Sequence, residues 1–380
     1  MHKTLTSFLF ILAMLLTLNL SNNQAYAQIE TKAKQAIVID YKTGAVLLNK
    51  NADEKMPTSS MSKVMTMYMV FEALKEGQIA LNDSLSVSEK AWRMGGSKMF
   101  VEVDKRVKIE DLIRGVIVQS GNDATIVLAE GLAGTESAFA DALTQKAQSL
   151  GMGNSNFKNA SGWPDPEHYS TARDLSTLAS KLIKNFPGFY KYYGEKEFTF
   201  NNIKQANRNP LLYRNIGADG VKTGHTEAGG YGLIGSGVEQ GRRVIIVVNG
   251  LEDERARAEE SAKLLEWGLK RFENKTLVKA GQVIETAEVV MGKLKAVGLV
   301  VKEDLFLTVP KMLGNTIKIE AKYNGPLIAP IKKDQEIGIL EISAPGMEKV
   351  TKTLYAAEAV EELGLFAKTI AKAKLLIQKQ

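Results

Sequence analysis

The 380-residue sequence predicts an α+β domain with helices around an antiparallel sheet, followed by a small all-β domain. In residues 28–275, strand-like runs stand at the beginning and near the end, and patterns of helical spacing lie between them. The early and late strands are expected to pair in one sheet. Residues 276–355 consist instead of short β-runs separated by Gly, Pro, Asn and Asp, which is typical of a sandwich or open barrel.

The first domain is predicted to open with a β-hairpin. Its strands are residues 36–40 and 45–49, joined by the turn Tyr41-Lys42-Thr43-Gly44. Apolar residues then recur at helical spacing from residue 61 to about residue 74. The remaining patterns of this domain predict helices at 109–118, 123–133, 137–149, 172–182 and 257–270, and strands at 231–235 and 244–248. The β-runs of the second domain are 287–290, 296–301, 305–309, 317–323 and 337–343.

Composition limits the chemistry that the chain can perform. It has no cysteine, which excludes disulfides, cysteine nucleophiles and thiolate metal sites. It has only three histidines. A histidine-rich metal site is not expected either, so we predict neither a metal nor a cofactor. The net charge of +6 is mildly basic, and it does not by itself indicate a nucleic-acid partner.

Residues 1–27 are predicted to be a secretory signal peptide. They have a basic start, a short apolar run from Phe8 to Leu18, and the small-x-small site Ala25-Tyr26-Ala27. The apolar run is shorter than the ~20 residues that a membrane-spanning helix needs. Cleavage after Ala27 is therefore expected, retention as an anchor is the alternative, and the mature protein is predicted to be exported.

Residues 356–380 are predicted to form an amphipathic tail. From residue 363 onward the tail has four lysines and no acidic residue, and one helical face carries Phe366, Ile370, Ala373 and Ile377. Such a helix suits the surface of an anionic membrane, where apolar burial and lysine attraction add together. Packing of the helix on its own β-domain is the alternative.

A serine with a built-in base is the first candidate for catalysis. The segment in question is Pro57-Thr58-Ser59-Ser60-Met61-Ser62-Lys63, at the predicted start of a helix. Ser60 and Lys63 are three residues apart, so they lie on one face of the first turn. The positive end of the helix dipole lowers the pKa of a nearby lysine and favours an alkoxide. An N-cap serine next to a solvated lysine is the structural alternative.

Two further clusters carry groups suited to the same chemistry. Gln119-Ser120-Gly121-Asn122-Asp123 places a hydroxyl, a glycine and an amide between two predicted helices, where an ordinary helix cap is the alternative. Gly220-Val221-Lys222-Thr223-Gly224-His225 offers a cation and a hydroxyl between glycines, where a plain turn is the alternative. Neither a phosphate-binding G-x-x-x-x-G-K-[ST] loop around Lys222 nor a G-x-S-x-G nucleophile elbow is present.

Taken in this order, S-x-x-K, S-G-N and K-T-G form a specific set. On these motifs the sequence resembles the penicillin-recognising serine acyl-enzymes, and most of all the low-molecular-mass penicillin-binding proteins that are D-alanyl-D-alanine carboxypeptidases. Further support comes from Gly96-Ser97-Lys98-Met99-Phe100, Leu112-Ile113-Arg114-Gly115, Tyr169-Ser170-Thr171-Ala172-Arg173-Asp174 and Arg257-Ala258-Glu259-Glu260-Ser261. The resemblance covers roughly residues 35–355 and implies a β-lactamase/transpeptidase-like catalytic domain at 28–275, with the β-rich domain and basic tail behind it.

The resemblance also implies roles for the motif residues. Ser60 is the expected nucleophile and Lys63 its general base. Ser120 would relay the proton to the leaving amine, and Asn122 would hold the substrate amide and help to position Lys63. Lys222 would supply positive potential that keeps the Lys63 amine neutral, and would link to Ser120.

Substrate binding is assigned to the residues around K-T-G. The oxyanion hole of the resembled family uses two backbone N–H groups, here those of Ser60 and of either Thr226 or His225. Thr223 and Arg257 are candidates to receive the terminal carboxylate, with a solvated helix-start arginine as the alternative for Arg257. Gly224 permits close approach of the backbone, and His225 is expected to be structural or to orient the substrate. His168, another of the three histidines, is expected to be exposed.

The implied activity is removal of the terminal D-alanine from peptidoglycan pentapeptides by an exported enzyme that β-lactams inhibit. The enzyme would work in the periplasm or wall space, with its tail on the outer face of the cytoplasmic membrane. Alternatives are a D,D-endopeptidase, a weak transpeptidase, or a catalytically silent cell-wall scaffold. Gly121 replaces the aspartate of class A β-lactamases, and no E-x-x-x-N segment matches their deacylating loop. A slow, long-lived penicilloyl adduct on Ser60 is therefore expected.

Overall fold

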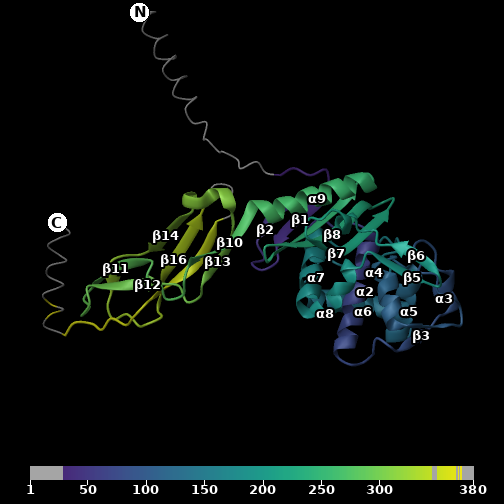
Figure 1. The fold of residues 1–380 in the computed structure, drawn as a ribbon. Helices are drawn as coiled ribbons and strands as arrows, with labels where there is room; N and C mark the ends of the chain where they lie inside the picture. Colours follow the sequence, from purple (N-terminus) through teal and green to yellow (C-terminus); the bar gives the residue numbers. More distant parts are fainter. Residues whose placement is uncertain (1–28, 345–348, 365–366, 368, 370–380) are drawn as a thin grey trace, which may run out of the picture. The chain divides into compact units, whose positions relative to one another are not determined.

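The computed structural model describes residues 29–344, 349–364, 367 and 369 (Figure 1). The described chain divides into two compact units, Ile29–Asn274 and a second that begins at Lys275. The predicted signal peptide and most of the predicted tail helix lie outside the described residues. Among the described residues, no helix combines the length and the apolarity that crossing a bilayer requires.

A five-stranded antiparallel sheet forms the centre of the first unit. Its order is β2 (Val46–Lys50), β1 (Gln35–Asp40), β9 (Arg242–Leu251), β8 (Gly230–Glu239) and β7 (Ala218–Thr226). Strands from the start of the unit thus pair with strands from its end. The α+β class and the pairing of early with late strands are confirmed.

Successive side chains of the central strands point to opposite faces of the sheet, and helices cover both faces. In β9, Val244, Ile246 and Val248 pack in one core with α9 (Glu254–Arg271), whereas Ile245 and Val247 belong to the core on the other face. This is the two-residue period of a strand that is buried on both faces. Figure 1 shows α9 along one face of the sheet and the remaining helices of the unit on the other.

The larger helical layer packs around α2 (Lys63–Lys75), which is buried on most of its surface. Its other helices are α3 (Glu89–Arg93), α4 (Ile109–Ile117), α5 (Asn122–Ala133), α6 (Glu136–Ser149), α7 (Ala172–Asn185) and α8 (Pro187–Tyr190). Two small hairpins complete it, β3 (Ser84–Ser86) with β4 (Arg106–Lys108) and β5 (Glu197–Phe200) with β6 (Ile203–Ala206). Short 3-10 turns are η1 (Ser59–Ser62), η2 (Lys191–Gly194) and η3 (Pro210–Tyr213).

Two local features differ from the sequence-based prediction. The helix expected from residue 61 begins as the 3-10 turn η1 and becomes α-helical only at Lys63. The K-T-G segment, expected to precede a strand, lies within β7 itself. Ser60 therefore lies on η1, and the K-T-G residues lie on β7.

The second unit is built from strands. A six-stranded sheet has the order β14 (Lys318–Tyr323), β16 (Glu336–Ser343), β17 (Val350–Ala356), β12 (Ala296–Val300), β11 (Glu285–Val290) and β15 (Leu327–Ile328). A separate pair joins β10 (Phe272–Val278) to β13 (Leu305–Pro310), and η4 (Lys311–Thr316) follows β13. The small all-β architecture is confirmed, although β10, β15 and β17 were not predicted.

Candidate active site

The S-x-x-K pair meets at the junction of η1 and α2. The Lys63 Nζ atom donates a hydrogen bond to Ser60 Oγ over 2.8 Å. Lys63 is fully buried, and Ser60 is partly exposed. A buried lysine next to a solvent-accessible serine has the geometry that a base and its nucleophile require.

Two further acceptors surround the Lys63 amine. Its Nζ atom lies 2.7 Å from Asn122 Oδ1 and 2.7 Å from the carbonyl oxygen of Ser161. The Asn122 amide is oriented by its other end, because Nδ2 donates to the carbonyl of Gly95 over 2.9 Å. The S-G-N turn and a loop that sequence reasoning did not assign therefore both hold Lys63.

Burial lowers the pKa of the Lys63 amine to about 7. Loss of hydration is the largest cause, because the charged form is the one that water stabilises. The positive charge of Arg208 lowers the pKa further, and the carboxylate of Asp123 opposes both effects. The neutral amine, which is the form that can accept a proton, is thus populated near neutral pH.

The S-G-N turn is fixed by close packing at the start of α5. Ser120 is buried and adopts a positive φ of 59°. A Cβ atom on Gly121 would lie 2.8 Å from the Asp123 carboxylate and 3.1 Å from the backbone nitrogen of Met99, so glycine is required there. The Asp123 carboxylate accepts hydrogen bonds from the backbone N–H groups of Met99, Phe100 and Val101, which ties the neighbouring loop to the turn.

The K-T-G segment brings the edge strand β7 directly against η1. Lys222 and Thr223 are buried, and the Lys222 Nζ atom donates to the carbonyl oxygen of Thr223 over 3.1 Å. Burial, followed by the charge of Lys63, holds the pKa of Lys222 well below its ordinary value. A Cβ atom on Gly224 would stand 2.9 Å from the carbonyl oxygen of Thr58, so only glycine lets the strand approach this closely.

The side chains of His225 and Arg257 both lie against the ring of Tyr231. The exposed His225 ring stacks on Tyr231 with the centroids 3.8 Å apart, and the Arg257 guanidinium lies 5.5 Å from the centroid of the same ring. Arg257 is buried, and its Nη2 atom is 3.6 Å from the Glu254 carboxylate. Within the described chain its Nε atom is buried with no hydrogen-bond partner. Arg257 is therefore not the solvated helix-start residue that was the alternative.

Comparison with known proteins identifies the family. Residues 21–253 match the family model described as D-alanyl-D-alanine carboxypeptidase. The chain belongs to this family. The second unit matches a model for the C-terminal domain of penicillin-binding protein 5, over residues 272–362.

The similarity to individual members of this family covers most of the chain. It is 39% identical to D-alanyl-D-alanine carboxypeptidase DacA of Haemophilus influenzae, over 88% of this chain and 87% of the relative. The solved structure of carboxypeptidase DacD from Francisella tularensis has a TM-score of 0.82 and 33% identity, covering 89% of this chain and 95% of that one. Penicillin binding protein 5 from Haemophilus influenzae has a TM-score of 0.73 and 38% identity, covering 88% and 99%.

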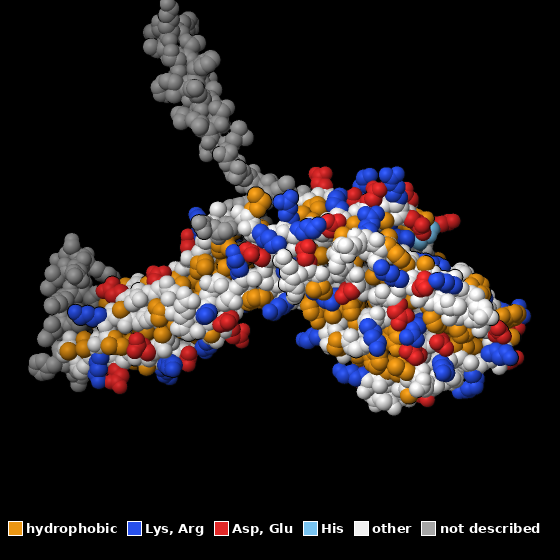
Figure 2. Space-filling model, viewed as in Figure 1, with side chains coloured by type: hydrophobic (Ala, Val, Ile, Leu, Met, Phe, Trp, Pro, Cys, Tyr) orange, Lys and Arg blue, Asp and Glu red, His pale blue; other side chains and the backbone are white. Residues whose placement is uncertain are grey.

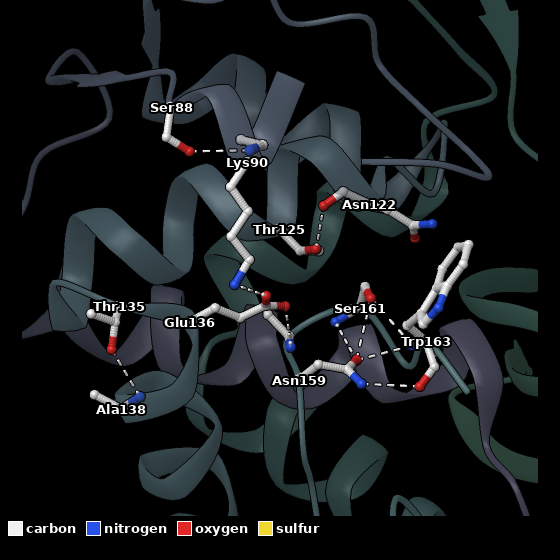
Figure 3. A network of polar contacts seen from close by, with 12 residues as sticks. Ser88, Lys90, Asn122, Thr125, Thr135, Glu136, Ala138, Asn159, Ser161 and Trp163 are labelled. Carbon is white, nitrogen blue, oxygen red and sulfur yellow. Dashed lines mark hydrogen bonds and ion pairs between the residues drawn. The ribbon is translucent and has the colours of Figure 1, made fainter. Parts of the chain in front are cut away.

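The loop behind Lys63, residues 159–163, belongs to the site but was not predicted from the sequence. Its centre is Asn159, whose Oδ1 atom accepts hydrogen bonds from the backbone N–H groups of Ser161, Gly162 and Trp163 (Figure 3). The Asn159 Nδ2 atom donates to the carbonyl of Trp163 over 2.9 Å. A single amide side chain thus folds the loop and fixes the Ser161 carbonyl that faces Lys63.

The same loop is anchored at both sides. The Glu136 carboxylate on α6 accepts from the backbone N–H of Ala160 and pairs with Lys90 over 2.8 Å (Figure 3). Gly162 has a φ of 78°, and a Cβ atom there would lie 1.8 Å from the carbonyl oxygen of Ser59. The backbone of the loop therefore packs directly on the turn that carries the nucleophile.

His168 is buried, contrary to the expected exposure. Its Nδ1 atom accepts a hydrogen bond from the backbone N–H of Lys158, so in the neutral ring Nε2 carries the proton. That Nε2 atom is 2.8 Å from Ser62 Oγ, which in turn is 2.6 Å from Thr58 Oγ1. Burial lowers the pKa of His168 to about 4. The ring is thus neutral at physiological pH and pins the loop to η1.

Arg208 is a second functional candidate that the sequence did not single out. It donates to Ser97 Oγ over 2.5 Å, and its charge lowers the pKa values of both Lys63 and Lys222. No motif surrounds it in the sequence. Its position becomes evident only from the folded chain.

Proposed function

We propose that this protein is a serine-type D-Ala-D-Ala carboxypeptidase that removes the terminal D-alanine of peptidoglycan pentapeptides through an acyl-enzyme on Ser60. The observation that carries the proposal is the buried Lys63 amine in hydrogen-bond contact with Ser60 Oγ. Membership of the carboxypeptidase family supports the substrate, and the penicillin-binding neighbours support inhibition by β-lactams.

The first step is proton transfer from Ser60 to Lys63. A neutral amine has two N–H groups and one lone pair. The Asn122 and Ser161 oxygens can only accept hydrogen bonds, so they take the two N–H groups. The lone pair is left facing Ser60 Oγ, which attacks the carbonyl carbon of the penultimate D-alanine as its proton passes to Lys63.

The remaining motif residues serve the tetrahedral intermediate. Backbone N–H groups of Ser60 and of His225 or Thr226 would stabilise the oxyanion. Ser120 would carry the proton to the leaving amine, with the buried Lys222 linked to it, while the Asn122 amide contacts the substrate as well as Lys63. Free D-alanine then leaves, and water hydrolyses the ester on Ser60.

The terminal carboxylate of the substrate needs a cationic and hydroxyl receptor. Thr223 lies in the K-T-G segment, and Gly224 brings that segment against the nucleophile turn. Arg208 joins Thr223 as a candidate receptor, since its charge already acts on both site lysines. Arg257, held over Tyr231 beside His225, would add long-range positive potential for the anionic substrate.

The proposal is tested by D-alanine release. The mature protein is incubated with a soluble pentapeptide that ends in D-Ala-D-Ala, and free D-alanine is quantified against time. We expect steady release that stops after preincubation with penicillin G. Release of a dipeptide or cross-linked product in place of D-alanine would favour the endopeptidase or transpeptidase alternative, and no product from folded protein would favour the scaffold.

We further propose that the protein is exported and bound to the outer face of the cytoplasmic membrane through residues 356–380. The lysine-rich, acid-free composition of residues 363–380 supports this. On the face shown in Figure 2, Lys and Arg side chains are interspersed with Asp and Glu over the described residues, which offers an anionic membrane no single basic field there.

Deleting residues 363–380 should release the protein from anionic vesicles and leave D-alanine release from a soluble peptide intact. Vesicle co-sedimentation of the full mature chain and the deletion variant measures the first effect. Neutral vesicles serve as the control, because lysine attraction requires anionic lipid. Equal sedimentation of both proteins would contradict a membrane role for the tail and favour its packing on the β-domain.

A further inference from the structure

The strand that carries K-T-G contains a bulge shortly before Lys222. The register of β7 against β8 shifts between Ala218 and Gly220, where two steps along β7 match one step along β8. Asp219 is therefore the additional residue of a β-bulge. Regular pairing resumes after the bulge, and Lys222 lies opposite Ile234. No step of the mechanism above uses the bulge.

The bulge decides which face of the sheet Lys222 occupies. Residues that lie opposite each other on paired strands share one face, and Ile234 belongs to the core under the larger helical layer. Lys222 is thus on the face that carries η1 and α2, where it is buried. A slip of one residue would turn its side chain to the other face. The K-T-G geometry therefore requires that the extra residue stays where it is.

The carboxylate of Asp219 is held by hydrogen bonds from two other elements. Arg243 on β9 binds it through both Nη atoms, with Nη1 2.8 Å from Oδ1 and Nη2 2.7 Å from Oδ2. The Arg243 Nη1 atom also donates to Ser236 Oγ on β8 over 2.6 Å. The Tyr190 hydroxyl, at the end of α8, donates to Asp219 Oδ1 over 2.8 Å. One carboxylate thus ties three neighbouring strands and α8 together at the bulge.

Burial makes this network a firm support. The Arg243 side chain is 17% exposed, and its guanidinium lies 5.3 Å from the centroid of the Tyr190 ring. Burial, followed by the negative charge of Asp219, raises the pKa of the Tyr190 hydroxyl well above its ordinary value, so the hydroxyl keeps its proton and donates. A planar guanidinium bound through two nitrogens fixes the orientation of a carboxylate as well as its distance. The Asp219 carboxylate is therefore an oriented anchor for the start of β7.

We propose that Asp219 is a positioning residue for the reaction: its carboxylate, held by Arg243 and Tyr190, fixes the bulge, and the bulge places Lys222 in the site. Asp219 acts on the chemistry only through Lys222. An ion pair that merely stabilised the fold would change the melting temperature and leave the rate of acylation alone. The proposal rests on the carboxypeptidase function proposed above, because Lys222 is one of the groups that serve that reaction.

Two tyrosine substitutions test the network with the same chemical change. Tyr190→Phe removes the hydroxyl that binds Asp219 and keeps the ring. It should slow acylation by penicillin G roughly tenfold, the scale of one hydrogen bond to a charged group. Tyr193→Phe is the matched control, because Tyr193 is also next to Gly220 but its buried hydroxyl has no hydrogen-bond partner within the described chain. Its rate should stay at the wild-type value. Equal slowing in both variants, or none in Tyr190→Phe, would contradict the proposal.

A double substitution shows through which residue Asp219 acts. Asp219→Ala alone should slow acylation about 100-fold, the scale of a 1 Å displacement in an active site. In a Lys222→Met background it should cause little further loss, because no lysine is left to position. Asp53→Ala is the control, since Asp53 is likewise bound through two nitrogens of one arginine, Arg173, over 2.6 and 2.9 Å. It should leave the rate unchanged in both backgrounds.

The same 100-fold loss from Asp219→Ala in the Lys222→Met background would overturn the proposal, because it would indicate a general disturbance of the unit. Melting temperatures show whether each variant is folded, and the tyrosine pair decides the question if Asp219→Ala is not. Acylation is followed by intact mass, so these outcomes do not depend on turnover of peptide. Wild-type protein that shows the expected acylation pattern but releases no D-alanine would refute the carboxypeptidase function alone.

Discussion

Ser60→Ala protein will form no covalent adduct with penicillin G, and its release of D-alanine will fall by about 10⁴-fold or more. The reason is that Ser60 Oγ is the atom that forms the ester, and the other groups of the site only act on that atom. Wild-type protein should gain the mass of one penicillin molecule in intact-mass spectrometry. The adduct should be long-lived, because the chain lacks the deacylating segment of class A β-lactamases.

Ser62→Ala is the matched control for this substitution. Ser62 lies on the same turn, but its hydroxyl is engaged by His168 and Thr58, so it should not be a nucleophile. The Ser62→Ala variant should still form the adduct. An adduct on Ser60→Ala protein, or its loss only in Ser62→Ala protein, would contradict the assignment of the nucleophile.

The order of elements in the first unit could be predicted because its strands and helices have strong periodicity. β1 and β9 contain continuous apolar runs that are buried on both faces of the sheet. β9 ends at Leu251, and α9 begins at Glu254 after the N-cap residue Asp253. β7 lacked this signal, since its sequence Ala-Asp-Gly-Val-Lys-Thr-Gly-His-Thr is polar and rich in glycine. Of the two glycines that hide the strand in the sequence, Gly224 lets it approach η1 in the structure, and Gly220 lets it approach Tyr190.

The parts of the site that could be predicted from the sequence are the side chains of recognisable motifs. Ser60, Lys63 and Asn122 come from two motifs, and the structure brings all three into contact. The Ser161 carbonyl could not be predicted, because a backbone group leaves no residue-type signal and its position depends on Asn159. Arg208 was missed for a related reason, since nothing in its local sequence distinguishes it from a surface arginine.

The buried state of His168 depends on tertiary contacts that a local pattern does not encode. Its neighbours Pro166 and Glu167 are exposed, which is what the loop composition indicated. The ring itself turns inward, where Ser62 and the backbone N–H of Lys158 satisfy both of its nitrogen atoms. A polar residue can be buried at this position because every polar atom of the ring has a partner.

The rate of acylation by penicillin G should rise with pH through about 7 and level off above it. Below that value Lys63 is protonated and cannot accept the Ser60 proton, so each pH unit lower costs about tenfold in rate. Stopped-flow measurement of the acylation rate between pH 5 and pH 9 records this rise with pH, which is the acidic limb of the profile. Lys63→Met should reduce acylation by roughly 10³-fold, within the range of general-base catalysis, and should abolish the limb.

Arg208 connects this pH profile to the charges of the site. Its positive charge lowers the pKa of Lys63, so Arg208→Gln should let that pKa rise and move the limb to higher pH. Arg208→Lys keeps the charge and should leave the limb near its wild-type position, even if both variants bind the carboxylate of penicillin less tightly. A limb that stays in place in Arg208→Gln, or persists in Lys63→Met, would show that another group titrates. The midpoint of the limb, and not the plateau rate, therefore decides whether Lys63 is the base.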